Sequence, residues 1–158
     1  MAVEIERKFL VVGDEWKKSG TAKVYRQGYI NRQDGGNTVR IRQAGERGYI
    51  TIKGKTQGIA RAEFEYEIPL ADAEDMLETL CDRPLIEKVR YRIPLEGLVW
   101  EVDEFSGDNE GLIIAEVELD RDDRAIVLPR WIGKEVTRDK KYYNVNLIEY
   151  PYKDWTDK

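Results

Sequence analysis

The amino-acid sequence predicts a single α+β domain built on a large antiparallel β-sheet. Apolar and polar residues alternate along eight segments, which is the period of half-buried strands. Turn residues separate most of these segments, and one region instead has a helical period. The 158 residues are enough for one domain with a packed core. We therefore expect one domain over residues 1–150 and a loosely held tail over residues 151–158.

The alternating segments are the expected strands. Turn signals follow several of them, at residues 34–37, 45–48 and 96–97. Long strands in this number can close into a barrel, so we expect an eight-stranded antiparallel β-barrel with helices packed on the outside. The expected strands cover residues 3–11, 24–33, 38–44, 49–55, 61–68, 87–94, 98–105 and 112–119.

Residues 71–81 are expected to form a helix. Ala73, Met76, Leu77 and Leu80 recur at i, i+3, i+4 and i+7, which places them on one helix face. The acidic residues near the start of this segment suit the positive end of the helix dipole. Two further helices are expected over residues 121–128, where Pro129 ends the helix, and over residues 139–149.

The chain has no histidine and a single cysteine, Cys81. The absence of histidine excludes a Ser-His-Asp triad, a histidine general base and a histidine-ligated metal. One cysteine excludes an intramolecular disulfide and a cysteine-rich zinc site. Any metal must therefore bind oxygen ligands, which favours Mg²⁺ or Mn²⁺.

Charge and hydropathy indicate the compartment and the partners. Lys and Arg total 26 and Asp and Glu total 31, and this net charge of −5 argues against nucleic acid as the main partner. The apolar runs, such as residues 9–12, are too short to span a bilayer. Residues 1–4 lack the basic region and apolar stretch of a signal peptide. We expect a cytoplasmic protein with no membrane partner, and a homodimer is possible.

Charged residues make up 36% of the chain, above the roughly 25% of ordinary soluble domains. When each expected strand is divided into its two faces, most of these charges fall on one face. For any single strand, a polar face in water is the ordinary explanation. Seven strands together present a polar face that is almost entirely ionised, with acidic strands at both ends and basic strands between. This face carries Glu4, Glu6, Lys8, Arg40, Arg42, Lys53, Lys55, Arg61, Glu63, Glu65, Glu67, Lys88, Arg90, Arg92, Glu101, Asp103, Glu116 and Glu118.

A barrel lumen lined by this face would be too costly to keep dry. It must hold water, metal ions and a polyanion. Arg and Lys bind phosphate oxygens, and clustered carboxylates attract hard divalent cations. The sequence therefore predicts a metal–polyphosphate site of the kind used in phosphoryl transfer.

The run Glu4-Ile5-Glu6-Arg7-Lys8 resembles the N-terminal Glu-x-Glu-x-Lys signature of the CYTH family, the triphosphate tunnel metalloenzymes. Eight further segments resemble family segments in the family order, and the resemblance extends over about residues 3–146. The chain looks most similar to the small, single-domain bacterial members. The further segments are Arg26–Tyr29, Arg40–Arg42, Thr51–Lys53, Arg61–Glu65, Lys88–Arg90, Asp103–Gly107, Glu116–Glu118 and Gly133–Thr137.

The resemblance implies an eight-stranded barrel forming a tunnel, in which triphosphate compounds are hydrolysed or rearranged with Mg²⁺ or Mn²⁺. It implies that Glu4, Glu6 and Glu118 hold a first metal. It implies that a second metal, its water and the basic side chains are placed by Glu63, Glu65, Asp103 and Glu116. It implies phosphate contacts from Lys8, Arg40, Arg42, Lys53, Lys88, Arg90 and Lys134. The segment near Tyr142 and Tyr143 is expected to plug one end of the tunnel.

The mechanism that fits is in-line attack of a metal-activated water on the terminal phosphorus. The Arg and Lys side chains, with Lys8, Arg40 and Lys53 in catalytic roles, would stabilise the charge that develops on the phosphate oxygens. Because histidine is absent, Glu63 or Glu65 is expected to accept the proton.

Several other charged and aromatic residues are expected to lie outside the site. Charges near the strand ends are expected at the rim, and the tyrosines of the second and fourth strands are expected to pack rather than line the tunnel. The rim residues are Lys55, Arg61, Glu67, Arg92 and Glu101. The tyrosines are Tyr25, Tyr29 and Tyr49.

The leading functional hypothesis is a metal-dependent hydrolase of inorganic tripolyphosphate or nucleoside triphosphates. A class IV adenylyl cyclase is the second hypothesis, because the same family contains such enzymes, but no segment obviously binds adenine. A non-catalytic polyphosphate-binding module is the third. An RNA 5′-triphosphatase is possible too, although the acidic balance gives no sign of an RNA-binding surface.

Overall fold

The computed structural model describes residues 3–30 and 36–158. Within them, nine strands form one antiparallel sheet. The strands are β1 (Val3–Val11), β2 (Thr21–Ile30), β3 (Thr38–Ala44), β4 (Arg47–Lys53), β5 (Ala60–Ile68), β6 (Ile86–Leu95), β7 (Leu98–Phe105), β8 (Ile113–Glu118) and β9 (Ile132–Glu135). The helix is α1 (Leu70–Thr79), and the 3₁₀ turns are η1 (Glu15–Lys18), η2 (Gly107–Asn109), η3 (Lys140–Tyr142), η4 (Asn144–Leu147) and η5 (Tyr152–Asp154).

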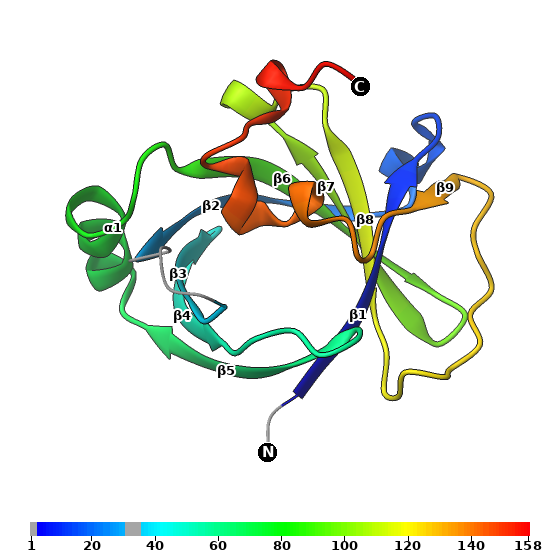
Figure 1. The fold of residues 1–158 in the computed structure, drawn as a ribbon, viewed down its shortest axis with the longest axis horizontal. Coiled ribbons are helices and arrows are strands. Elements are labelled where there is room, and N and C mark those ends of the chain that lie inside the picture. Colours follow the sequence, from blue (N-terminus) through cyan, green and yellow to red (C-terminus); the bar gives the residue numbers. More distant parts are fainter. Residues whose placement is uncertain (1–2, 31–35) are drawn as a thin grey trace.

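The sheet closes into a barrel of eight strands, as the sequence predicts. The order is β5-β4-β3-β2-β6-β7-β8-β1, and β1 pairs back onto β5 to complete the ring (Figure 1). The closing seam is short and pairs residues 3–5 with residues 60–62. Beyond this seam, β1 continues along β8 and also pairs with β9. Closure removes the free strand edges that an open sheet would present.

The turn between β6 and β7 follows the expected chemistry. Glu96 and Gly97 both have positive φ, at 54° and 76°, between the paired residues Leu95 and Leu98. Two such residues in succession make the tight hairpin turn that matches the twist of antiparallel strands. Residues 34 and 35 of the hairpin expected at residues 34–37, and the end of the strand expected over residues 24–33, lie outside the described residues.

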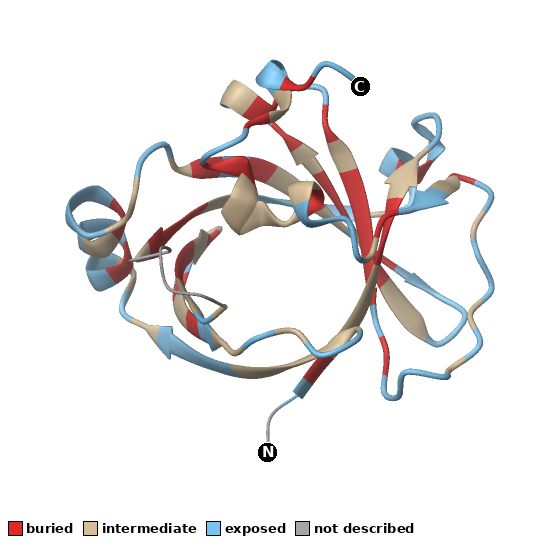
Figure 2. Cartoon of the chain, viewed as in Figure 1, coloured by how far each residue is buried: buried red, intermediate tan, exposed pale blue. Residues whose placement is uncertain are grey.

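The apolar core lies outside the barrel wall, because each strand turns its apolar side outward. One cluster buries Phe9, Trp16, Trp100 and Trp131 on the outer side of β1, β7 and β8. Figure 2 shows the buried positions concentrated along these strands, while α1 covers the opposite side of the ring. The polar side of the strands therefore faces the lumen.

The α1 helix confirms the helix expected over residues 71–81. Ala73 and Leu77 pack on Ile41 of β3. At Gly48 of β4, a Cβ atom would lie 2.6 Å from the Cβ of Ala73, so glycine permits the close approach of helix and strand. None of the helices in the described residues is long and apolar enough to cross a membrane.

The helix expected over residues 121–128 is wrong. Residues 124–129 have no regular structure, and Val127 is 71% exposed. A helix this short forms only when an apolar face can be buried. Of the three consecutive apolar residues 126–128, only Ile126 packs on a core cluster. The segment instead leads to β9, a four-residue strand that the alternation did not predict.

The helix expected over residues 139–149 is replaced by two 3₁₀ turns, η3 and η4. They are separated at Tyr143, whose backbone is extended (φ −71°, ψ 131°). The break lets Tyr142 and Leu147 enter the core while Tyr143 and Asn144 face the lumen. A continuous helix would not divide neighbouring side chains in this way.

The C-terminal residues are not loosely held at Trp155, which is 4% exposed. Its ring packs edge-on against Tyr142 and Tyr152, with ring centroids 5.1 and 5.0 Å away. The indole Nε1 also donates a 3.0 Å hydrogen bond to the carbonyl of Tyr150. Trp155 therefore belongs to the core cluster that fixes the C-terminal segment on the barrel.

Candidate active site

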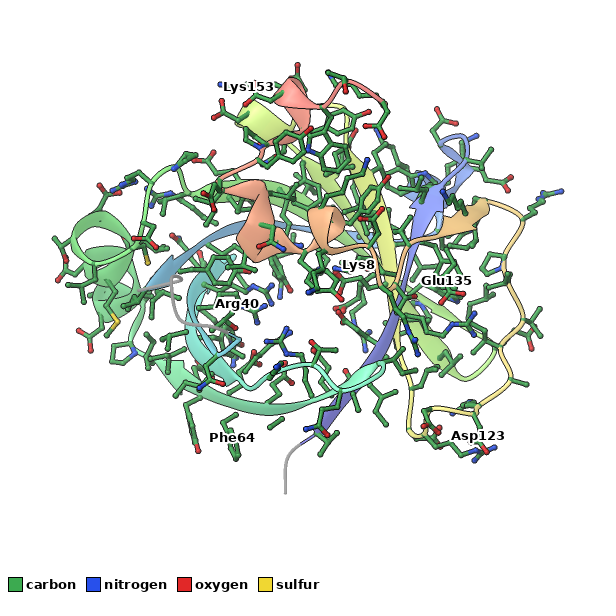
Figure 3. All side chains as sticks on the ribbon, in the orientation of Figure 1. Lys8, Arg40, Phe64, Asp123, Glu135 and Lys153 are labelled. Atoms are coloured by element: carbon green, nitrogen blue, oxygen red, sulfur yellow. The ribbon has the colours of Figure 1, made fainter. Side chains whose placement is uncertain are left out.

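The barrel encloses a cavity of about 360 Å³ with charged walls. Figure 3 shows Lys8 and Arg40 directed into the barrel and Phe64 directed away from it, as strand alternation requires. The sequence-predicted site residues that line the cavity are Glu4, Glu6, Lys8, Arg40, Arg42, Lys53, Glu63, Glu65, Lys88, Arg90, Glu116 and Glu118.

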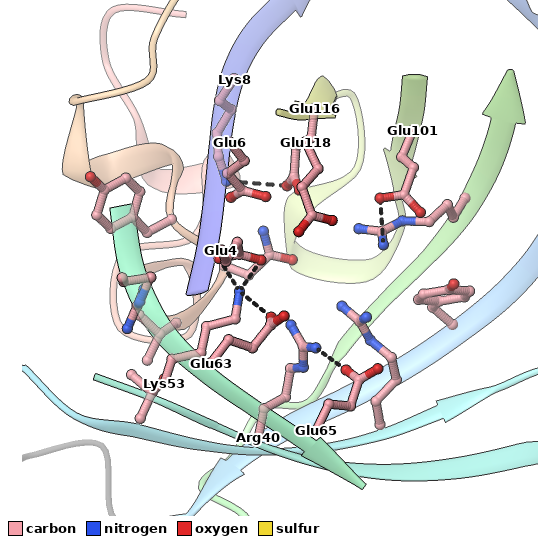
Figure 4. Close-up of a pocket in the computed structure, with 18 of the residues that line it drawn as sticks. Glu4, Glu6, Lys8, Arg40, Lys53, Glu63, Glu65, Glu101, Glu116 and Glu118 are labelled. Carbon is pink, nitrogen blue, oxygen red and sulfur yellow. Dashed lines mark hydrogen bonds and ion pairs between the residues drawn. The ribbon is translucent and has the colours of Figure 1, made fainter. Parts of the chain in front are cut away.

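The carboxylates gather where β1 meets β8 and β5 (Figure 4). Glu6 lies opposite Glu118 in the β1–β8 register, and Lys8 lies opposite Glu116. Lys8 Nζ is 3.2 Å from Glu116 Oε1, and both side chains are nearly buried. Glu63 of β5 adds another carboxylate from across the seam. A compact group of glutamates therefore faces one side of the cavity.

The carboxylates in this group differ in their affinity for protons. Burial, followed by the charges of Glu116 and Glu4, raises the pKa of Glu6 to about 8. Burial and the neighbouring Glu4 raise the pKa of Glu63 to about 7. Glu116 is also buried, but the attraction of Lys8 and Arg90 holds its pKa well below the usual value. Burial with too few neighbouring cations therefore raises the proton affinity of Glu6 and Glu63 above that of Glu116.

The basic side chains come mainly from β3 and β6. Arg90 forms a bidentate pair with Asp103, at 2.7 and 2.9 Å, and Lys88 Nζ lies 2.7 Å from the same carboxylate. Burial lowers the pKa of Lys88 to about 7, and the charges of Arg90 and Arg42 lower it further. Asp103 has the opposite effect but does not outweigh them. Burial, with Arg40 and Arg90 nearby, lowers the pKa of Arg42 to about 9. The cations repel one another, so an anion between them would be favourable.

Arg40 provides a second indication that an anion belongs in the cavity. Its Nη2 is 3.2 Å from Thr51 Oγ1 and 3.4 Å from Glu65 Oε2. Its Nε is buried and has no hydrogen-bond acceptor within the part of the chain that the structure describes. A buried donor without an acceptor is costly, and a phosphate oxygen would satisfy it.

Two predicted site residues do not line the cavity. Asp103 is on the inward face of β7 but is buried beneath Lys88 and Arg90, with which it pairs, so it holds basic side chains in place, and its contact with a metal stays a prediction. Lys134 lies on β9 and lines a separate outer depression together with Arg7. Lys134 therefore lies away from the cavity in this structure, and its contact with phosphate stays a prediction.

Several lining residues were missed or assigned elsewhere. Tyr25, Tyr29 and Tyr49 line the cavity rather than only packing, and Arg61 and Glu101 line it rather than lying at a solvated rim. The alternation of the second strand places Lys23, Tyr25, Gln27 and Tyr29 on one face. This alternation is a sequence signal that Tyr25 and Tyr29 face the lumen. Residues 137 and 143–145 have no such signal, because they reach the lumen from an irregular segment.

The acidic wall of the cavity has the side-chain chemistry of a site for a divalent cation. No group of three or more acidic or cysteine side chains in the described residues is already arranged as a metal cluster. The side-chain chemistry nevertheless fits a hard divalent cation, because the lining offers several glutamate oxygens. Burial, followed by repulsion from neighbouring carboxylates, raises the pKa values of Glu6 and Glu63, and a divalent cation would favour their charged forms.

The fold and the site define a polyanion-binding barrel, with a basic wall for phosphate oxygens and an acidic wall suited to a divalent cation. The chain belongs to the CYTH domain family, whose model matches residues 2–152. Triphosphatases of this family are metal-dependent.

Named relatives match the chain along almost its whole length. An inorganic triphosphatase of Acetivibrio thermocellus is 50% identical over 157 residues, which cover 99% of this chain and 100% of that protein. An inorganic triphosphatase of Nitrosomonas europaea is 36% identical over 148 residues, which cover 91% and 95% of the two chains. A crystal structure of an inorganic triphosphatase superposes with a TM-score of 0.66 at 34% identity, covering 94% and 95%.

Proposed function

We propose that this protein hydrolyses the terminal phosphoanhydride of inorganic tripolyphosphate, of nucleoside triphosphates, or of both, inside the barrel with Mg²⁺ or Mn²⁺. The observation that carries the proposal is the division of one cavity into a basic wall and an acidic wall. The two inorganic triphosphatases that match over nearly the full chain support the same reaction.

The basic wall is proposed to bind and orient the triphosphate. Lys8, Arg40, Arg42, Lys53, Lys88 and Arg90 donate hydrogen bonds to phosphate oxygens in this scheme. Arg40 has a buried donor ready for such an acceptor. Fixed cations of this kind stabilise the charge that grows on the equatorial and leaving oxygens. Asp103 acts indirectly, because it orients Lys88 and Arg90 from behind the wall.

The acidic wall is proposed to hold the metal. Glu4, Glu6 and Glu118 would bind a first Mg²⁺ or Mn²⁺, with Glu116 beside them. Such an ion supplies a Lewis acid that neutralises phosphate charge and lowers the pKa of a bound water. Glu63 is the favoured proton acceptor, since its pKa is raised to about 7, whereas Glu65 is held by Thr51 at 2.8 Å and by Arg40. A base with a pKa near the working pH is largely deprotonated and still binds a proton well, so it is an effective proton acceptor.

A phosphate-release panel tests the proposal. The purified protein would be incubated with tripolyphosphate, ATP, GTP, thiamine triphosphate and pyrophosphate, each with Mg²⁺ or Mn²⁺. We expect release from at least one triphosphate and much less from pyrophosphate. Folded protein that releases no phosphate from any triphosphate with either metal would overturn it.

The same panel separates the alternatives. Cyclic AMP formed from ATP would indicate a cyclase, and tight triphosphate binding without turnover would indicate a binding module. Release from a 5′-triphosphorylated RNA alone would indicate an RNA triphosphatase. The cytoplasmic location and the possible homodimer stay predictions from the sequence.

A further inference from the structure

Two neutral amides lie among the cations of the basic wall. Gln27 of β2 is fully buried, and its Oε1 accepts a 2.9 Å hydrogen bond from Arg42 Nε. Its Nε2 donates to Asn144 Oδ1 at 3.3 Å and to the Tyr29 hydroxyl at 3.2 Å. Asn144 Oδ1 also accepts a 2.8 Å hydrogen bond from Lys88 Nζ. The two amides therefore connect two proposed phosphate-binding cations.

These contacts are part of a closed circuit. From Lys88 the circuit continues through Asp103 to Arg90, by the short ion pairs already described. The ring of Tyr25 completes it, with the Arg90 guanidinium 4.9 Å and the Arg42 guanidinium 4.7 Å from the ring centroid. Each cation is thus held on two sides, so its direction is fixed before any anion arrives.

The cations of this circuit differ in how far they are neutralised. Arg90 pairs with Asp103 and also with Glu101, at 3.4 Å, and Lys88 shares Asp103 with it. Arg42, by contrast, has no carboxylate partner among residues 3–30 and 36–158, where Gln27 and Tyr25 hold it. An amide oxygen accepts a hydrogen bond as a carboxylate does, but it carries no charge. The amide therefore orients the guanidinium and leaves its positive charge for a substrate.

We infer that Gln27 and Asn144 are positioning residues that orient Arg42 and Lys88 for the triphosphate and add no negative charge to either. This inference rests on the proposed function, because it assumes that both cations bind phosphate. Asn144 comes from the C-terminal segment, 117 residues away from Gln27 in the sequence. The segment therefore supplies part of the binding wall rather than only closing one end.

The replacement Asn144→Asp tests the inference. Aspartate keeps the shape and the oxygen that accepts from Gln27 and Lys88, so a purely structural role would survive. The added negative charge would give Lys88 a second carboxylate besides Asp103, which would compete with the phosphate for it. We expect the KM for tripolyphosphate to rise at least ~10-fold with kcat changed less than ~3-fold. The melting temperature should stay the same or rise. Gln27→Glu should act in the same way through Arg42.

Asn146→Asp is the matched control. It adds the same charge to the same turn, but the Asn146 amide bonds to the backbone carbonyl of Lys140, at 2.8 Å, and not to a cation of the cavity. We expect wild-type KM and kcat from this control. An Asn144→Asp protein with wild-type KM and kcat would overturn the inference.

A binding measurement keeps this test independent of the proposed function. If the wild-type protein does not turn over tripolyphosphate, the proposed function fails, and calorimetric affinity for inorganic triphosphate replaces KM. Weaker binding by Asn144→Asp than by Asn146→Asp would still support the positioning role. Equal binding by the two variants would exclude it.

Discussion

Lys53 on β4 reaches past β5 to Glu4 on β1, with its Nζ 2.8 Å from Oε1 and 3.0 Å from Oε2. The same ammonium is 3.5 Å from Glu63 on β5. Among the residues that the structure describes, the backbone seam between β1 and β5 pairs residues 3–5 with residues 60–62. Lys53 therefore joins side chains across the seam that closes the barrel, and it lies at the meeting point of the basic and acidic walls.

We expect Lys53→Met to destabilise the metal-free protein by about 2 kcal/mol, because it leaves Glu4 buried without its cation. Saturating Mg²⁺ should restore part of this loss, since a divalent cation can neutralise Glu4. The measurement is urea unfolding with and without Mg²⁺, with the exposed Lys55→Met as control. Unchanged stability of Lys53→Met would contradict the structural role of the pair.

Glu6→Ala and Arg40→Ala should each lower kcat/KM for tripolyphosphate by at least ~100-fold while the barrel stays folded. Glu6 belongs to the proposed metal-binding group, and Arg40 offers a buried donor to phosphate. Steady-state kinetics and circular dichroism provide the measurement. Glu104→Ala and Arg26→Ala are the controls, because they remove surface ion pairs to Lys17 and Glu78. Full activity in both cavity variants would contradict the site.

Lys134→Ala should keep wild-type kcat/KM, whereas Lys88→Ala should lose at least ~100-fold. The reason is position: Lys88 lines the cavity, and Lys134 lies in the outer depression. Both variants remove one lysine charge, so each serves as the control for the other. A large loss in Lys134→Ala would mean that the C-terminal part of the chain moves to the cavity when substrate binds.

Trp155→Ala should destabilise the protein by about 3 kcal/mol, because it removes a buried aromatic side chain and leaves a cavity. Denaturant unfolding measures the effect. Deletion of residues 156–158, which are exposed, is the control and should cost far less. Equal effects of the two changes would show that the C-terminal residues are a loose tail after all.

The thiol of Cys81 should react slowly with iodoacetamide at pH 8. Burial, with a smaller contribution from Asp82, raises the pKa of Cys81 to about 11, so the thiolate fraction falls roughly 100-fold relative to a thiol with a pKa of 9. The unfolded protein deprotonates at lower pH, so this group also lowers stability as the pH rises from about 9 to about 11. Alkylation followed by mass spectrometry, native against urea-unfolded, checks the prediction. Similar rates in both states would contradict it.

Much of the barrel was predictable because strand alternation is a local property. β1, β3 and β7 have the predicted bounds, and both ends of α1 lie within two residues of the predicted ends. The failures lie where the backbone is irregular. At Tyr143 the chain leaves helical geometry because neighbouring side chains must enter the core and the lumen, and no periodicity reports this.

The candidate site shows the same division. The alternation of side chains along a strand is enough to predict that Glu6, Arg40 and Lys88 point inward, because successive side chains point to opposite faces. The same alternation predicts that Asp103 points inward, but it cannot predict how deeply the side chain is buried. Asp103 is on the predicted face, yet it is buried behind Lys88 and Arg90.

By itself, the sequence determined the strands, their charged face and the kind of ligand that such a face can hold, because these follow from residue order and side-chain chemistry. Only the tertiary structure decided which charges meet. The closure of β1 on β5 brings Lys53 to Glu4, and the break at Tyr143 brings Asn144 to Gln27 and Lys88. These contacts join residues that are far apart in the chain, so they depend on strand register and on the path of irregular segments, which no local pattern contains.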